Sequence, residues 1–288
     1  MHKLITCFLV VLILVPGGSF GADGSLRKVS LLPHWIPQAQ FAGYMVALEK
    51  GFYREAGLDL QLLRGGPGKE GFEALDSGKV TFCVEWLSAA MKRRASGLEI
   101  VNLGQIVQRS ALILVARKES GITRPEDLSG RKVGLWPGLF SLQPEALFRR
   151  HKVSPIIVPN YTSMELFLKR GVDAIAAMWY NEYHLLLNSG LNPDELQLFF
   201  FYSMGLNFPE DGLYTTEQTF ASDPDMCRSF VQASLKGWLY AFQNKDEALA
   251  IVMKHADAAQ TGTNRAHQRW MLNRMEDLIL PENDMARL

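Results

Sequence analysis

The sequence predicts an α/β fold made of two lobes that face each other across a cleft. Residues 29–62 read as strand, loop, helix and strand, which together make one βαβ unit. A similar order, in which a turn leads into a buried strand ending in aromatic and polar residues, occurs at 76–86 and again at 170–180. A strongly apolar strand at 196–202 then leads the chain back toward the first lobe.

The composition is that of an ordinary globular protein. The chain has 288 residues, of which 48% are hydrophobic and 21% charged, and its formal net charge is zero. This length and composition suit one large or two modest domains with a sizeable core. Because Lys and Arg are not in excess, the sequence predicts no binding to nucleic acid.

The first 22 residues are predicted to be a secretory signal peptide, cleaved after Gly21 or Ala22. Lys3 is followed by an apolar run at 4–15, and small residues follow the break at Pro16. The run is too short to cross a membrane. The mature protein is therefore expected in the periplasm, with an uncleaved anchor as the alternative.

The first lobe begins with a strand at 29–32 and a loop that holds two prolines. Apolar residues at helical spacing, from Phe41 to Phe52, predict one helix after this loop, and a strand at 58–63 follows. A glycine-rich loop at 64–71 comes next. It either presents backbone N–H groups to an anionic or carbonyl group or forms a plain tight connection.

The following strand ends in a carboxylate beside an indole, Glu85 and Trp86. A buried carboxylate is costly unless it is paired, so Glu85 either contacts a bound ligand or forms an internal pair. Polar residues between the strands at 100–107 and 111–116 indicate a crossing between the lobes. The expected organisation is lobe 1 at 23–110 and 206–288, lobe 2 at 111–205, and hinges near 109–116 and 199–206.

The rest of the chain continues the alternation of strands and helices. Asp223 followed by Pro224 is typical of a helix N-cap and first position, and it predicts a helix start. The other elements are expected at 131–136 (strand), 141–151 (helix), 156–158 (strand), 164–168 (helix), 172–180 (strand), 205–212 (polar loop), 214–215 (strand), 245–255 (helix) and 265–278 (helix).

Two cysteines remain after the signal peptide, Cys83 and Cys227. Both lie in apolar patterns, so two free and mostly buried thiols are expected, with a disulfide as the alternative. No Cys/His spacing resembles a zinc site, and the sequence predicts neither a metal nor a cofactor.

Aromatic and polar residues gather at the strand ends that would face the cleft. Aromatic planes can bracket a flat heterocycle, while amides and carboxylates match ring nitrogens and an exocyclic amine. Trp238 and Trp270, at helical spacing, are assigned to the core. The candidate ligand-binding residues are Trp35, Gln38, Tyr44, Glu85, Trp86, Trp136, Trp179, Tyr180, Asn181, Glu182, Asn207 and Asp211.

No catalytic site is predicted. An enzyme would need a nucleophile, an acid–base pair or a metal. The histidines are scattered, and although His34 and His184 flank the expected cleft, neither has a serine or cysteine in a recognisable arrangement.

The stretch HWIPQAQFAGYMVALEKGFYREAGLD, residues 34–59, resembles the opening of solute-binding proteins of ABC importers for thiamine-pyrimidine precursors, the formylaminopyrimidine-binding family. Residues 178–182 and 207–212 extend the resemblance. It implies a type II periplasmic-binding-protein fold, ligand capture by lobe closure, a monomer, and docking on a membrane permease. A thiamine-pyrimidine precursor is the favoured ligand, and flavin-like or aromatic sulfonate ligands stay open. The family also implies one or two further helices beyond Leu288.

The same superfamily holds the eukaryotic synthase of the thiamine pyrimidine, which is the first rival interpretation. In that synthase a lysine that holds pyridoxal phosphate and a histidine that is consumed follow a glycine–lysine–valine turn. Here the matching stretch, residues 85–89, has neither, and residues 198–215 lack the synthase's cysteines. These departures favour binding over synthesis. The second rival is a ligand-binding sensor domain fused to a signalling module.

Overall fold

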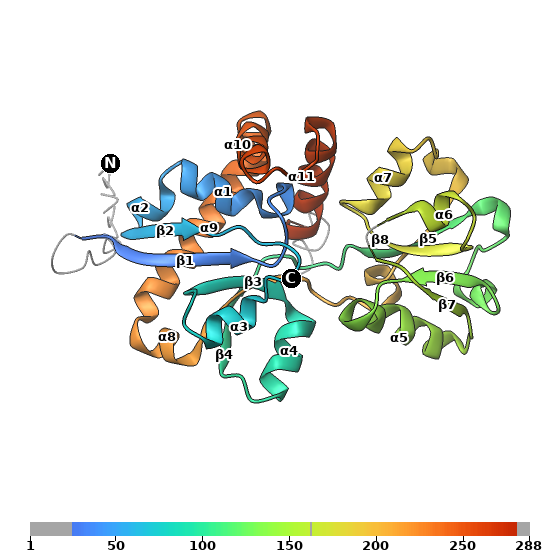
Figure 1. The fold of residues 1–288 in the computed structure, drawn as a ribbon, viewed down its shortest axis with the longest axis horizontal. Coiled ribbons are helices and arrows are strands. Elements are labelled where there is room, and N and C mark those ends of the chain that lie inside the picture. Colours follow the sequence, from blue (N-terminus) through green and yellow to red (C-terminus); the bar gives the residue numbers. More distant parts are fainter. Residues whose placement is uncertain (1–24, 162, 281–288) are drawn as a thin grey trace, which may run out of the picture.

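The computed structural model describes residues 25–161 and 163–280, and the predicted signal peptide lies outside them. Two five-stranded sheets carry helices on both faces and form two lobes side by side (Figure 1). The predicted two-lobed α/β fold is therefore confirmed.

The sheet of lobe 1 has the strand order β2-β1-β3-β10-β4. Strands β1, β2 and β3 are parallel, whereas β10 runs antiparallel to both of its neighbours. Strand β10 follows lobe 2 in the chain yet lies between β3 and β4. The strands are β1 (Arg27–Pro33), β2 (Leu58–Leu62), β3 (Phe82–Trp86), β4 (Ile100–Gln105) and β10 (Asp211–Thr216).

The sheet of lobe 2 has the order β7-β6-β8-β5-β9, and its first strand, β5, is antiparallel to β8 and β9. Its central strands are apolar on both faces, because helices cover both sides of the sheet. The strands are β5 (Leu112–Arg117), β6 (Lys132–Leu135), β7 (Ile156–Pro159), β8 (Ala174–Met178) and β9 (Leu196–Phe200). The helices are α5 (Leu142–His151), α6 (Glu165–Leu168) and α7 (Glu182–Asn188).

The helices of lobe 1 surround its sheet, with α1 and α9 together on one face and α3 and α4 on the other (Figure 1). Helix α9 begins as predicted, because the Asp223 carboxylate accepts the Met226 N–H at 2.9 Å and Pro224 takes the first position. These helices are α1 (Ala42–Glu49), α2 (Phe52–Glu55), α3 (Gly71–Asp76), α4 (Leu87–Ala95), α8 (Glu217–Ser222), α9 (Pro224–Gln243), α10 (Lys245–Ala258) and α11 (Arg265–Ile279). The 3-10 turns are η1 (Ala39–Phe41), η2 (Lys118–Ser120), η3 (Pro125–Leu128), η4 (Gly138–Ser141), η5 (Pro193–Glu195) and η6 (Tyr202–Met204).

Two of the predicted elements are wrong in their bounds. The helix expected from Phe41 to Phe52 is broken in two, because Gly51 adopts a left-handed conformation with φ of 76° between α1 and α2. The polar loop expected at 205–212 ends early, because Asp211 and Gly212 already pair with β3 as the start of β10.

The connections between the lobes, residues 106–111 and 201–210, are bonded to each other. The Asn207 side chain accepts the Ser110 N–H at 2.8 Å and donates to the Gln108 carbonyl at 3.0 Å. Glu210 Oε1 accepts the Ala111 N–H at 2.6 Å. The predicted hinge ranges are displaced from these connections, because β5 and the end of β9 belong to the lobe 2 sheet. The exact domain limits stay a prediction.

The thiols and tryptophans complete the fold. Cys83 and Cys227 are free and buried, as predicted. Trp238 lies in the core of lobe 1, but Trp270 does not, because it is partly exposed where α11 meets lobe 2. Among the described helices, none is both long and apolar enough to span a bilayer.

Candidate functional site

A buried polar network lies at the edge of lobe 1 that faces lobe 2. His34 follows β1 and Asp211 opens β10, and their side chains meet with Nε2 and Oδ1 2.9 Å apart. Gln40 donates to the second carboxylate oxygen of Asp211 at 2.9 Å, and Gln38 donates to Gln40 at 2.7 Å. Asp211 is only 2% exposed. The structure thus brings two predicted residues, Gln38 and Asp211, into one network.

The charge of this network depends on His34. Burial lowers the pKa of His34, but the charge of Asp211 and its hydrogen bond, with smaller contributions from Glu85 and Glu210, raise that pKa overall above 6.5. Below this raised pKa, the His34 imidazole carries a positive charge beside Asp211. A buried, bonded pair of this kind can orient other polar groups that approach it.

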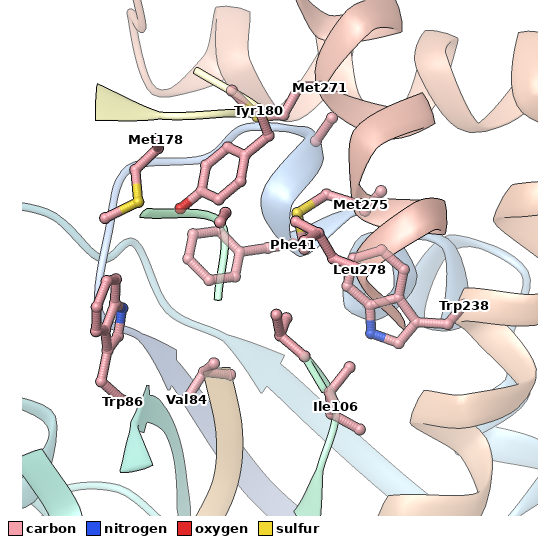
Figure 2. Close-up of a cluster of buried hydrophobic side chains, with 14 of the residues drawn as sticks. Phe41, Val84, Trp86, Ile106, Met178, Tyr180, Trp238, Met271, Met275 and Leu278 are labelled. Carbon is pink, nitrogen blue, oxygen red and sulfur yellow. The ribbon is translucent and has the colours of Figure 1, made fainter. Parts of the chain in front are cut away.

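Next to the network lies a group of aromatic and apolar side chains from both lobes (Figure 2). Trp86, at the end of β3, is 7% exposed, and its ring meets Phe140 of lobe 2 edge to face with centroids 4.7 Å apart. The Trp86 indole N–H is buried and has no hydrogen-bond partner. Figure 2 shows the Tyr180 hydroxyl directed toward Trp86 and Met178. Because an unpaired buried donor costs free energy, the Trp86 N–H is suited to donate a hydrogen bond to an acceptor that enters this site.

The segment after β8 carries four of the predicted residues. Trp179 packs edge to face on Phe200 at 5.4 Å. Glu182 accepts hydrogen bonds from the Met178 N–H at 2.9 Å and from the Asn181 amide at 2.8 Å. Burial raises the pKa of Glu182, although these hydrogen bonds lower it in part. Asn181 and Glu182 thus already hold the turn between β8 and α7.

Glu85 points away from Trp86, toward the start of α3. Its Oε1 accepts the Gly71 N–H at 3.1 Å, so the internal pair is the alternative that the structure shows. Burial raises the pKa of Glu85, while His34 lowers it. In the glycine-rich loop, a Cβ on Gly65 would lie 2.0 Å from the Pro33 carbonyl oxygen, which favours a tight connection.

Trp35 lines a cavity of about 200 Å³ on the side of lobe 1. Pro37, Phe41 and Met45 line it as well, together with the loop at 62–65 and the end of α10. This is room for a single aromatic ring, since cavities of similar size bind benzene in other proteins. Trp136, in lobe 2, donates its N–H to the Tyr161 carbonyl and lies 5.8 Å from Phe140.

Two predicted residues lie apart from the others. Tyr44 is 1% exposed and packs edge to face on Trp238 at 5.7 Å, because its position in α1 turns it toward α9. Asn207 is exposed, and both ends of its side-chain amide are used within the connections between the lobes. A ligand-binding role for the predicted residues stays a prediction.

The structure places at the lobe boundary several residues that are not among the candidate ligand-binding residues. The sequence signals two of them, His34, which is expected to flank the cleft, and Gln40, which lies in the same polar loop as Trp35 and Gln38. Phe140, His267 and Trp270 had none, because a turn in lobe 2 and a helix near the end of the described chain bring them there.

Two mixed α/β sheets, joined by two connections and facing each other across polar and aromatic side chains, have the architecture of two-lobed periplasmic binding proteins. The periplasmic aliphatic sulphonate binding protein SsuA from Escherichia coli superposes with a TM-score of 0.67 at 16% identity, covering 89% of this chain and 85% of that chain. Residues 38–248 match the family described as NMT1/THI5 like, and the chain belongs to this family.

Known relatives include binding proteins and enzymes. The formylaminopyrimidine-binding protein of Halalkalibacterium halodurans is 23% identical over 269 residues, which cover 89% of this chain and 80% of that protein. The riboflavin-binding protein RibY of Chloroflexus aurantiacus is 24% identical over 275 residues, covering 92% and 76%. The 4-amino-5-hydroxymethyl-2-methylpyrimidine phosphate synthase of Legionella pneumophila is 29% identical over 114 residues, which cover 39% of this chain and 36% of the synthase.

Proposed function

We propose that this chain is the periplasmic solute-binding component of an ABC importer and that it binds a small flat heterocycle between its lobes. The observation that carries this proposal is the buried, unpartnered N–H of Trp86 among aromatic side chains of both lobes. Leaving such a donor unpaired costs about 1–3 kcal/mol, so a ring nitrogen or carbonyl that accepts it stabilises the bound state.

Binding is a better account than catalysis. The relatives described as binding proteins match about nine-tenths of the chain, whereas the synthase of Legionella pneumophila matches 39% of it. The lysine and histidine expected in a synthase are absent from residues 85–89. The partner of the closed protein would be a membrane permease.

A thiamine-pyrimidine precursor is the favoured ligand. Its ring nitrogens can accept from the Trp86 N–H, and its exocyclic amine can donate to the Asp211 carboxylate, whose partners are His34 and Gln40. A sulfonate would bring a negative charge toward the carboxylates of Asp211 and Glu182. A flavin offers acceptors too, but its three fused rings need more room between the lobes than a single pyrimidine ring does.

The test is a thermal-shift and calorimetric screen of the mature protein with formylaminopyrimidine, other aminopyrimidines, thiamine, riboflavin and alkanesulfonates. A ligand at 100 times its dissociation constant adds about 2.7 kcal/mol to the free energy of unfolding. We expect this shift with an aminopyrimidine and its loss in Trp179→Ala.

Trp238→Phe, in the core of lobe 1, is the matched control and should lower the melting temperature while keeping the ligand shift. If only riboflavin raised the melting temperature, the proposed ligand would be a flavin and not a pyrimidine. No shift with any compound would overturn the ligand class.

A further inference from the structure

Helix α11 belongs to lobe 1, but it reaches the segment of lobe 2 that follows β8 (Figure 1). His267 Nε2 lies 2.9 Å from the Asn181 side-chain oxygen, and the Trp270 N–H donates to the Trp179 carbonyl at 3.2 Å. The Arg274 guanidinium lies 4.7 Å from the centre of the Trp179 ring. One face of α11 therefore holds two of the predicted ligand-binding residues across the lobe boundary.

A pair of histidines also joins α11 to α7, the helix that follows this segment. The Nδ1 atoms of His184, on α7, and His267 are 2.8 Å apart, and the rings stack with centroids 5.1 Å apart. Trp270 also stacks on His184, with ring centroids 4.8 Å apart and an angle of 9° between the ring planes. A hydrogen bond between two imidazole nitrogens needs one of them to lack a proton. The contact therefore forms only while at least one ring is neutral.

The surroundings do not compensate a charge on both rings. The described hydrogen-bond partners of the two imidazoles are each other, Asn181 and Asn188. The charged side chains nearby have partners of their own. Arg274 pairs with Asp277, and both Arg265 and Arg269 pair with Asp246 of α10. Glu182 accepts hydrogen bonds from Met178 and Asn181. Arg274 adds a further positive charge on the same helix face.

We propose that these contacts form a clasp that positions Trp179 and Asn181 for the ligand and that opens in acid. We call it the α11 clasp and define it as His184, His267, Trp270 and Arg274 with their partners Trp179 and Asn181. Its link to ligand binding rests on the proposed function, whereas its effect on the lobes does not need a ligand.

The direction of the pH effect follows from the chemistry of the pair. Burial, with a smaller contribution from His184, lowers the pKa of His267 to about 4, and burial lowers that of His184. The clasp is therefore fully formed above about pH 6.5 and weakens as the pH falls toward about 4. At pH 5 the ratio of joined to separated lobes should fall about tenfold. The fall is no larger because water at the lobe boundary screens part of the repulsion between the charged rings.

The experiment measures the distance between the lobes in the full mature protein without ligand. Spin labels are placed on Lys79→Cys in lobe 1 and Asp194→Cys in lobe 2, both exposed, while the native Cys83 and Cys227 are buried. Pulsed electron paramagnetic resonance at pH 7.5 and 5.0 should show a more separated population in acid. His267→Gln, and separately His184→Gln, should abolish this response, because glutamine keeps a donor but does not titrate.

The matched control is His151→Gln, because His151 bonds to Glu126 within lobe 2, away from the boundary, at 2.7 Å. It should keep the acid response. A distance that does not change with pH, or an unchanged response in both clasp variants, would overturn the proposal. Ligand affinity should fall about tenfold between pH 7.5 and 5.0 in the parent and less in His267→Gln. Loss of all ligand binding at pH 7.5 would count against the proposed function, while the distances would still test the clasp.

Discussion

Trp86 and Trp136 lie on opposite sides of the lobe boundary, both near Phe140, and differ in one hydrogen bond. The Trp136 N–H donates to the Tyr161 carbonyl, whereas the Trp86 N–H has no partner. Removing the Trp136 N–H would therefore lose a hydrogen bond that the free protein makes. Removing the Trp86 N–H would lose no bond of the free protein and would remove the cost of an unpaired buried donor. Any hydrogen bond that the Trp86 N–H makes forms only in the complex with a ligand.

Trp86→Phe should therefore lower ligand affinity about tenfold, which is roughly 1.4 kcal/mol, while the free energy of unfolding of the free protein changes little. Calorimetric titration and urea unfolding measure the two quantities. In the control, Trp136→Phe should lower the free energy of unfolding by about 1 kcal/mol and affect affinity less. Equal losses of affinity in both variants would contradict a special role for the Trp86 N–H.

At the residue scale, the sequence could predict which residue types would lie near the boundary but not what each one contacts. Trp86 follows from its place at the carboxyl end of β3, because parallel strands bring their carboxyl ends to one edge of a sheet. Gln38 lies in the loop that follows β1. Asp211 is the first residue of β10, which runs antiparallel to β3, so its place depends on a long-range pairing. Successive side chains of a strand point to opposite faces of the sheet. For this reason Glu85 points toward α3 while Trp86 points toward the lobe boundary. The pairing of His184 with His267, 83 residues apart in the chain, depends on how the lobes dock and has no local signal.

The crossing of α1 and α9 requires two glycines. A Cβ on Gly237 would lie 2.1 Å from the Gly43 carbonyl oxygen, and one on Gly43 would meet the Trp238 ring at 2.3 Å. Backbones this close leave no room for a methyl group, so neither helix can shift without losing its fit to the other.

Gly237→Ala should lower the free energy of unfolding by about 3 kcal/mol, the upper end for overpacking, because the nearest atom belongs to backbone. Gly262→Ala, where nothing lies within 4 Å, is the control and should stay within about 0.5 kcal/mol of the parent. Urea unfolding at neutral pH measures both. Similar values for the two variants would mean that the helices separate at little cost.

Glu210 joins the two connections between the lobes as a buried acid. Burial, with the Asp211 charge, raises its pKa to about 8, although hydrogen bonds from Ala111 and Ser110 lower it in part. Because the pKa in the folded state is above that of the unfolded chain, the associated stability is present below about pH 4.5 and is lost as the pH rises toward 8.

Glu210→Gln removes this titration and keeps an acceptor for the Ala111 N–H. Relative to the parent, its free energy of unfolding should rise by several kcal/mol, of the order of 4, between pH 4.5 and pH 8. Urea unfolding across this range gives the difference directly. Glu55→Gln, an exposed carboxylate on α2, should show no comparable trend. A flat difference for Glu210→Gln would indicate that water or a nearby proton donor compensates the charge.

At the scale of elements, hydrophobic periodicity located nearly every strand and helix, because the central strands of both sheets are buried on both faces. It failed where one residue decides the backbone. Gly51 ends α1 through its left-handed conformation, and the apolar spacing of Phe41 to Phe52 conceals the break. The early start of β10 at Asp211 depends on its pairing with Trp86, which is a long-range contact.

The whole molecule has two lobes that meet through side chains and are joined by two short connections. A ligand that contacts both lobes stabilises their approach, because its affinity for the joined state exceeds that for the separated one. Small-angle X-ray scattering at pH 5.0, where the α11 clasp is weakened, should therefore show a smaller radius of gyration with a bound aminopyrimidine than without it. Trp179→Ala with the same compound should keep the larger value, and an unchanged radius in the parent would count against lobe closure.

The position of β10 has a consequence for the order in which the two lobes fold. Lobe 2 is one continuous stretch from β5 to β9, whereas the sheet of lobe 1 lacks the strand between β3 and β4 until β10 has been made. Lobe 2 can thus fold first from contacts close in sequence, while lobe 1 waits for pairings such as Cys83 with Tyr214. A chain that ends before Asp211 would combine a finished lobe 2 with a lobe 1 sheet that has open strand edges, which makes it prone to aggregate.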